Sequence, residues 1–201
     1  IYGAVSGLLG GKSDSVMMRI VEIIYSLPDI LIIILLQLML KPILEEKSAS
    51  GSGGVLQVLG PGIIAIFVVF GLLYWVGMAR IVRAQVLSLK EMEYINAARA
   101  LGANNRRLIF KHLLPNSMGT IIVTTMLQIP AAIFTEAFLS FLGLGVSAPL
   151  ASLGSLSSQA LNGISSYPYM LIFPALAISL IILSFNLFGD GLRDALDPKL
   201  K

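Results

Sequence analysis

The chain holds few side chains whose types and spacing could do chemistry. Gly10, Gly11, Lys12 and Ser13 imitate the end of a phosphate-binding P-loop. The full motif needs a glycine where Ser6 stands and a β-strand before it. An apolar stretch precedes it instead, so we predict no nucleotide binding by this chain.

His112 is the single histidine, and the chain has no cysteine. A structural or catalytic metal site needs several Cys, His or carboxylate ligands close together. His112 is therefore expected to hydrogen-bond within a loop, and no Ser/His/Asp set accompanies it. We predict no catalytic residue, no metal site and no cofactor, and hence a protein that is not an enzyme.

Three acidic residues stand inside otherwise apolar segments, where an ionised carboxylate is costly and often functional. Glu22 is expected to reach water near the membrane boundary. Asp29 follows Pro28, which interrupts a helical hydrogen-bond ladder, and we expect Asp29 to line a substrate path. Glu136 is expected to make a structural hydrogen bond between helices.

The composition requires an apolar surrounding for most of the chain. Of its 201 residues, 56% are hydrophobic and 12% charged, and the mean hydropathy is +0.88. A bilayer core is crossed by about 20 apolar residues in a helix. Four segments reach that length and a fifth is partial, so the predicted fold is an all-α, polytopic bundle with about five visible spanning helices. The complete segments are residues 20–40, 61–79, 117–146 and 167–188, and the partial one is residues 1–10.

Because the chain opens on Ile1 inside an apolar stretch, we expect further residues to precede it.

Charge between the segments predicts their orientation. Residues 80–111 carry seven basic and two acidic side chains, a net of +5. The connection at residues 41–60, with a Ser/Gly-rich stretch at 48–54, has no net charge, and the one at 147–166 has no charge at all. We therefore place residues 80–115, 11–18 and 190–201 in the cytoplasm and the two neutral connections outside.

The basic connection has an ordered pattern. Ser88 and Glu91 have the spacing of a capping box at a helix start, and Gly102 suits a left-handed helix end. Between them, one small apolar face is expected from Tyr94, Ala97, Ala98 and Leu101.

A second helical run is expected over residues 106–114. It should end at Pro115, with Asn116 and Ser117 capping the next spanning helix. From these patterns alone, an amphipathic segment lying on the membrane surface is a competing interpretation. Nucleic-acid binding is not expected, because no aromatic stacking pattern accompanies the basic residues.

The run at residues 93–102, continuing to 112–116, resembles the EAA loop of bacterial ABC importer permeases. Ala97, Ala98, Gly102, Leu114 and Pro115 match its pattern, whereas Asn96 replaces a glutamate and His112 stands where isoleucine is common. In that family the loop contacts the ATPase subunit. The resemblance therefore implies an ATPase-coupling loop over residues 88–115, formed by Glu93, Tyr94, Asn96, Ala97, Ala98, Arg99, Leu101, Gly102, His112, Leu114 and Pro115.

Residues 137–145, 147–152 and 185–198 are similar to the dipeptide/oligopeptide/nickel branch of these permeases, in particular its C-type subunit. The resemblance implies one MetI-like permease domain over residues 1–201 in the bacterial cytoplasmic membrane. It also implies a heterodimer with a sister permease, two ABC ATPase subunits and an extracytoplasmic binding protein. The implied cargo is an oligopeptide or dipeptide, with nickel or glutathione as alternatives.

An ion-coupled secondary carrier remains a second hypothesis from the residues alone. Such a carrier would need paired intramembrane charges and broken helices, and it would not need the Ala-Ala-Arg-x-Leu-Gly loop.

Overall fold

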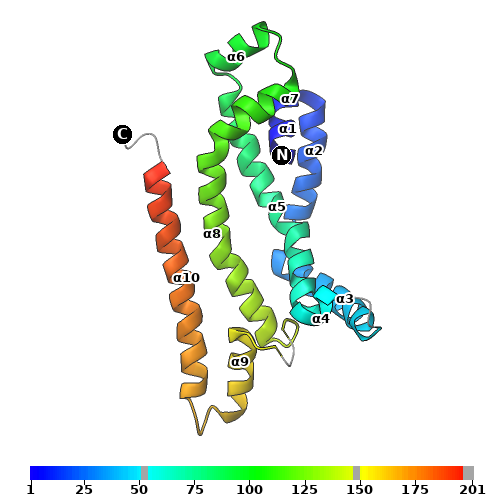
Figure 1. The fold of residues 1–201 in the computed structure, drawn as a ribbon, viewed down its shortest axis with the longest axis vertical. Coiled ribbons are helices and arrows are strands. Elements are labelled where there is room, and N and C mark those ends of the chain that lie inside the picture. The colour runs from blue at the N-terminus through cyan, green and yellow to red at the C-terminus, as the bar shows by residue number, and fades with distance from the viewer. Residues whose placement is uncertain (51–53, 147–149, 197–201) are drawn as a thin grey trace. The chain divides into compact units, whose positions relative to one another are not determined.

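The computed structural model describes residues 1–50, 54–146 and 150–196, and every element within these ranges is a helix (Figure 1). Three stretches used in the sequence analysis lie partly outside the described residues. They are 51–53 of the Ser/Gly-rich stretch 48–54, 147–149 of the permease-like run 147–152, and 197–198 of the permease-like run 185–198. The elements run in the order α1 Tyr2–Leu9, α2 Gly11–Tyr25, α3 Asp29–Ala49, α4 Gly54–Leu59, α5 Pro61–Leu89, α6 Glu93–Ala100, α7 Asn105–Arg107, a π-helix Leu108–Leu113, α8 Leu114–Phe141, α9 Leu153–Ala160, a 3-10 helix Leu161–Gly163, and α10 Tyr169–Leu196.

Within the described ranges, three helical stretches are long and apolar enough to cross a membrane. They are α5, the continuous run Asn105–Phe141 that joins α7, the π-helix and α8, and α10. Together, α2 and α3 give a fourth if they are counted as one span bent by 80°. The predicted all-α, membrane-spanning fold class is confirmed, and α1 is the partial segment.

The predicted span over residues 20–40 is broken at Pro28, where the sequence indicates an interrupted hydrogen-bond ladder. α2 ends at Tyr25, and α3 begins at Asp29 after Pro28 in an extended conformation. Pro28 has no N–H to continue the ladder, and its ring disfavours a helical Leu27. The break therefore follows from the proline, and it places Asp29 in the first turn of a new helix.

The chain forms two compact units, each assembled from separate stretches. Unit 1 comprises Ile1–Leu27, Tyr74–Met126 and Phe188–Lys201, and unit 2 comprises Pro28–Leu73 and Leu127–Leu187. The long helices α5, α8 and α10 each contribute one end to unit 1 and the other to unit 2.

In unit 1, α1 packs closely on the C-terminal part of α5. A Cβ atom on Gly3 would collide with the carbonyl oxygen of Ala79, and one on Gly7 would lie 3.0 Å from a Val86 methyl. Small residues four apart allow such close helix contacts. Gly11, four residues after Gly7, has no atom within 4 Å of its Cβ position and begins α2 with a positive φ.

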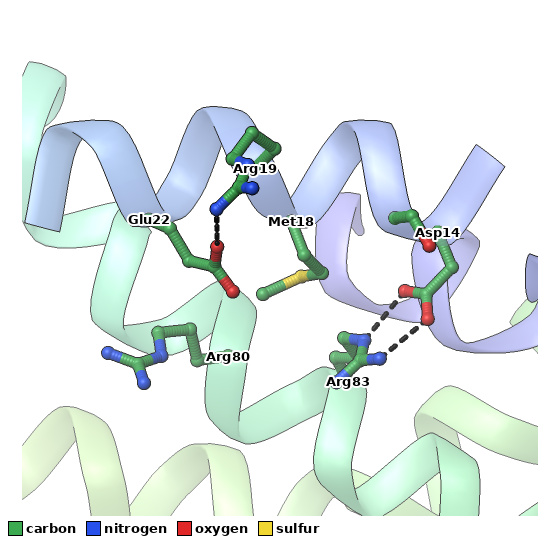
Figure 2. A pocket seen from close by; sticks show the side chains of 7 residues that line it. Asp14, Met18, Arg19, Glu22, Arg80 and Arg83 are labelled. Atoms are coloured by element: carbon green, nitrogen blue, oxygen red, sulfur yellow. Dashed lines mark hydrogen bonds and ion pairs between the residues drawn. The ribbon is translucent and has the colours of Figure 1, made fainter. Parts of the chain in front are cut away.

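A partly buried ion pair joins α2 to α5 (Figure 2). Arg83 donates from Nε to Oδ1 of Asp14 at 2.6 Å and from Nη2 to Oδ2 at 2.5 Å. The Ser6 hydroxyl donates to the same Oδ1 at 2.5 Å. Two parallel guanidinium bonds fix orientation as well as distance, so the three side chains tie α1, α2 and α5 together.

The same face of α2 also carries a looser pair. Arg19 and Glu22 lie 3.3 Å apart with side chains 76% and 56% exposed, against 31% and 12% for Arg83 and Asp14. Glu22 is exposed on the surface of α2. Exposed pairs of this kind contribute little to stability.

In unit 2, an amide and a hydroxyl side chain form hydrogen bonds with backbone groups of the turn that follows α8. The fully buried Gln37 of α3 donates from Nε2 to the carbonyl of Leu144 at 2.8 Å and to that of Gly62 at 3.2 Å. The Ser140 hydroxyl donates to Glu136 at 2.7 Å and accepts from the N–H of Val146 at 3.0 Å. The hydrogen bond of Glu136 thus lies within α8, not between helices as predicted.

We predict that Asp14→Asn lowers the melting temperature of the purified protein in its complex. The neutral amide cannot accept two bonds from Arg83 and one from Ser6, and losing charged hydrogen bonds costs about 1.5–3 kcal/mol. Glu22→Gln is the matched control, expected to change stability by about 0–1 kcal/mol because its pair is exposed. Equal melting temperatures for the two variants would show that the partly buried pair does not hold the helices.

Candidate functional site

The 88–115 segment begins differently from its sequence prediction. α5 continues through Ser88 to Leu89, and the N–H of Lys90 still bonds to the carbonyl of Val86. α6 starts at Glu93 with Met92 as its N-cap and no side-chain cap. The predicted capping box at Ser88 is therefore wrong: the apolar face of α5 extends through this turn, and its ladder prevails over the local signal.

One side of α6 is anchored in the core of unit 1. Ile95 is fully buried, and Ala98 packs against the same cluster. The buried members of that cluster come from α1, α5, α6 and the π-helix: Ala4, Leu8, Val82, Val86, Ile95, Leu108, Ile109 and Leu113. α6 is therefore held by side chains of three other elements.

The opposite side of α6 remains exposed. Tyr94 is 42% exposed and Leu101, just after the helix, is 88% exposed. Ala97 lies between them in sequence and is also exposed. The predicted face is thus divided, because Ala98 turns into the core with Ile95 while the other three remain available. We call Tyr94, Ala97 and Leu101 the docking face.

Gly102 ends α6 as predicted. Its φ is +82°, its N–H donates to the carbonyl of Arg99 at 2.9 Å, and the N–H of Ala103 donates to that of Ala98 at 3.0 Å. This is the Schellman pattern of helix termination. No atom lies within 4 Å of a Cβ placed on Gly102, so the backbone conformation, not space, requires glycine.

The second helical run does not end at Pro115. The N–H of Leu114 bonds five residues back to Ile109, and the π-helix continues directly into α8. Pro115 directly follows the π-turn as the second residue of α8, and its missing N–H does not end the helix there. The predicted capping roles of Asn116 and Ser117 are also wrong, because their side chains donate back to the carbonyls of His112 and Leu113, at 2.6 and 2.8 Å.

The remaining predicted residues lie at different depths. Leu114 packs against the core of unit 1 and His112 is half-buried in the π-helix. Asp29 is exposed and belongs to unit 2. The exposed predicted residues in and just after α6 include Glu93, Asn96, Arg99 and Gly102. Pro115 in α8 is exposed as well. Across the described ranges, no three His, Asp or Glu side chains gather as a metal site would require.

The sequence patterns missed two features that position this segment. One is the anchored side of α6: Ile95 and Ala98 are three residues apart and so share a helix face. The Ser6–Asp14–Arg83 cluster joins residues up to 77 positions apart, and no local spacing could reveal such a contact. The one local signal for this cluster is the acidic Asp14, which stands close to the apolar residues 1–10.

Comparison with known proteins places the whole chain in one family. The family model described as "Binding-protein-dependent transport system inner membrane component" matches residues 1–201. The chain is 48% identical over 201 residues to the oligopeptide transport system permease protein OppC of Bacillus subtilis (strain 168), covering all of this chain and 60% of the relative. It is 49% identical over 202 residues to the dipeptide transport system permease protein DppC of the same organism, covering all of this chain and 57% of the relative.

A more distant relative is the glutathione transport system permease protein GsiD of Pectobacterium atrosepticum. It is 38% identical over 199 residues, covering 99% of this chain and 60% of the relative. The chain thus spans less than two thirds of the length of each of these relatives. With three to four candidate spans among the residues that the structure describes, it is a multi-pass protein of the cytoplasmic membrane. The chain belongs to the family of binding-protein-dependent transport system inner membrane components.

Proposed function

We propose that the chain is a permease subunit of an ATP-driven importer and forms half of a translocation path for oligopeptides or dipeptides. The observation that carries this proposal is the placement of α6. Its docking face is exposed, and Ile95 on its opposite side is buried in the core of unit 1. The two relatives near 50% identity are named as oligopeptide and dipeptide permeases, which favours peptides over glutathione or nickel as cargo.

The partners follow from this role. A sister permease completes the path, two separate ATPase chains supply ATP hydrolysis, and an extracytoplasmic binding protein delivers the cargo. The ATPase meets Tyr94, Ala97 and Leu101, where a small alanine lets another surface approach the helix backbone. Because Ile95 packs among side chains of α1, α5 and the π-helix, movement of α6 is passed to the ends of two spanning helices.

The competing hypothesis of an ion-coupled carrier gains one structural feature, the bent α2–α3 pair. Broken helices are common in such carriers. The exposed docking face and the match of the whole chain to a binding-protein-dependent family favour the ATP-driven importer.

We predict that Gly102→Val uncouples ATP hydrolysis from uptake in the reconstituted complex. A side chain at positive φ costs about 1–2 kcal/mol, and relief of that strain would change the end of α6 and the position of Leu101. Gly143→Val is a matched control, because Gly143 has φ +79° and equally empty surroundings but lies in unit 2. Uptake per ATP hydrolysed should fall for Gly102→Val far more than for Gly143→Val; an equal ratio in both would contradict a coupling role for α6.

We also propose that Asp29 faces the translocation path and influences which peptides pass. It is exposed in the first turn of α3, beside the break at Pro28, and no ion pair is found for it among the described residues. A carboxylate there can meet the amino group of a peptide. The alternative role is local, since a negative charge at a helix N-terminus stabilises that helix.

Asp29→Asn separates these roles, because it removes the charge and nearly preserves the shape. We expect altered competition between peptides of different charge at normal complex yield. Glu45→Gln, an exposed acid later in α3, is the control and should leave selectivity unchanged. Unaltered selectivity in Asp29→Asn would remove Asp29 from the path, and a reduced yield would indicate the local role.

A further inference from the structure

A basic hollow of about 510 Å³ lies at the start of the longest helical run. Its lining residues are Asn104, Arg106, Arg107, Phe110 and Lys111. All five are exposed. The hollow contains three cationic side chains and no acidic one, so it presents a concentrated positive charge to whatever occupies it.

These three cations have no acidic partner within the part of the chain that the structure describes. The two ion pairs found there involve Arg19 and Arg83, not the basic residues of the hollow. Asn104 uses its side-chain oxygen to accept the N–H of Arg107 at 2.9 Å, which fixes the local backbone. Positive-inside topology explains why basic residues occur on this side, but not why three of them surround one hollow.

Phe110 indicates what kind of anion would fit. It is 54% exposed and belongs to the run Asn105–Phe141, which is long and apolar enough to cross the membrane. In the predicted orientation the hollow lies on the cytoplasmic side of that span, and an exposed aromatic side chain there suits contact with lipid headgroups at the membrane surface. An acidic protein surface would match the charges but would leave Phe110 unexplained. The docking face of α6 is a separate surface, because it lies before the turn at Gly102.

We propose that this hollow binds the phosphate headgroup of an anionic phospholipid of the cytoplasmic leaflet. Arg106, Arg107 and Lys111 contact the phosphate, and Phe110 packs against the glycerol region of the headgroup. The cytoplasmic leaflet is the anionic one, and basic pockets beside spanning helices suit such headgroups. The assignment to this leaflet uses the orientation derived from the charge distribution.

The test compares lipid binding by the intact complex and by a charge-neutralised variant. Native mass spectrometry of the purified complex, titrated with phosphatidylglycerol or phosphatidylcholine, counts the bound lipids. We expect saturable binding of phosphatidylglycerol, and Arg106→Gln with Lys111→Gln should weaken it by more than tenfold, at roughly fivefold per cation. The matched control, Lys12→Gln with Arg19→Gln, removes two exposed basic groups elsewhere in unit 1 and should bind as the parent does.

Two further measurements distinguish the other occupants. Inorganic phosphate should not displace phosphatidylglycerol at comparable concentration; displacement would indicate a site for free phosphate and overturn the proposal. Loss of the ATPase subunits from the Arg106→Gln/Lys111→Gln complex, with phosphatidylglycerol binding unchanged, would assign the hollow to protein contact. Equal binding of the two lipids by the parent complex would overturn the proposal as well.

Discussion

A backbone amide or carbonyl within a bilayer has no water to bond, and this constraint governs where the helices can break. At the end of α8, the N–H groups of Leu144 and Gly145 both return to the carbonyl of Leu139. Gln37 supplies a donor for the carbonyl of Leu144, and Ser140 supplies an acceptor for the next free N–H. Gln37 and Ser140 of unit 2 thus bond to the backbone, although the buried Oε1 of Gln37 has no hydrogen-bond partner among the described residues.

In unit 1, backbone hydrogen bonds and side-chain packing support α6. Its last carbonyls are bonded through the turn at Gly102, and the π-helix carries the chain past Pro115 without an open break. The Ser6–Asp14–Arg83 cluster fixes α1 and α2 against α5, while Ile95 rests on side chains of α1, α5 and the π-helix. A surface supported in this way can pass a displacement onward, because packed interiors transmit strain. The proposed coupling depends on that property.

Local patterns predicted the features that depend on neighbouring residues. Apolar length identified α5, α8 and α10, and the need for positive φ identified Gly102. They failed where two local signals competed: Ser88 has the spacing of a cap, yet the ladder of α5 continues through it. Pro115 is a helix breaker in general, but the preceding π-turn makes its missing N–H harmless. Contacts such as Arg83 with Asp14 or Gln37 with Leu144 join distant residues, and only the folded chain reveals them.

The central claim is that the docking face of α6 meets the ATPase. A photoactivatable benzoylphenylalanine at Leu101, which is 88% exposed, tests it in the assembled complex. The same group at Phe173 of α10, also largely exposed but in unit 2, is the control. We predict that irradiation joins the ATPase chain to position 101 and not to position 173. An active complex that yields no ATPase adduct at position 101, or equal adducts at both positions, would contradict the account.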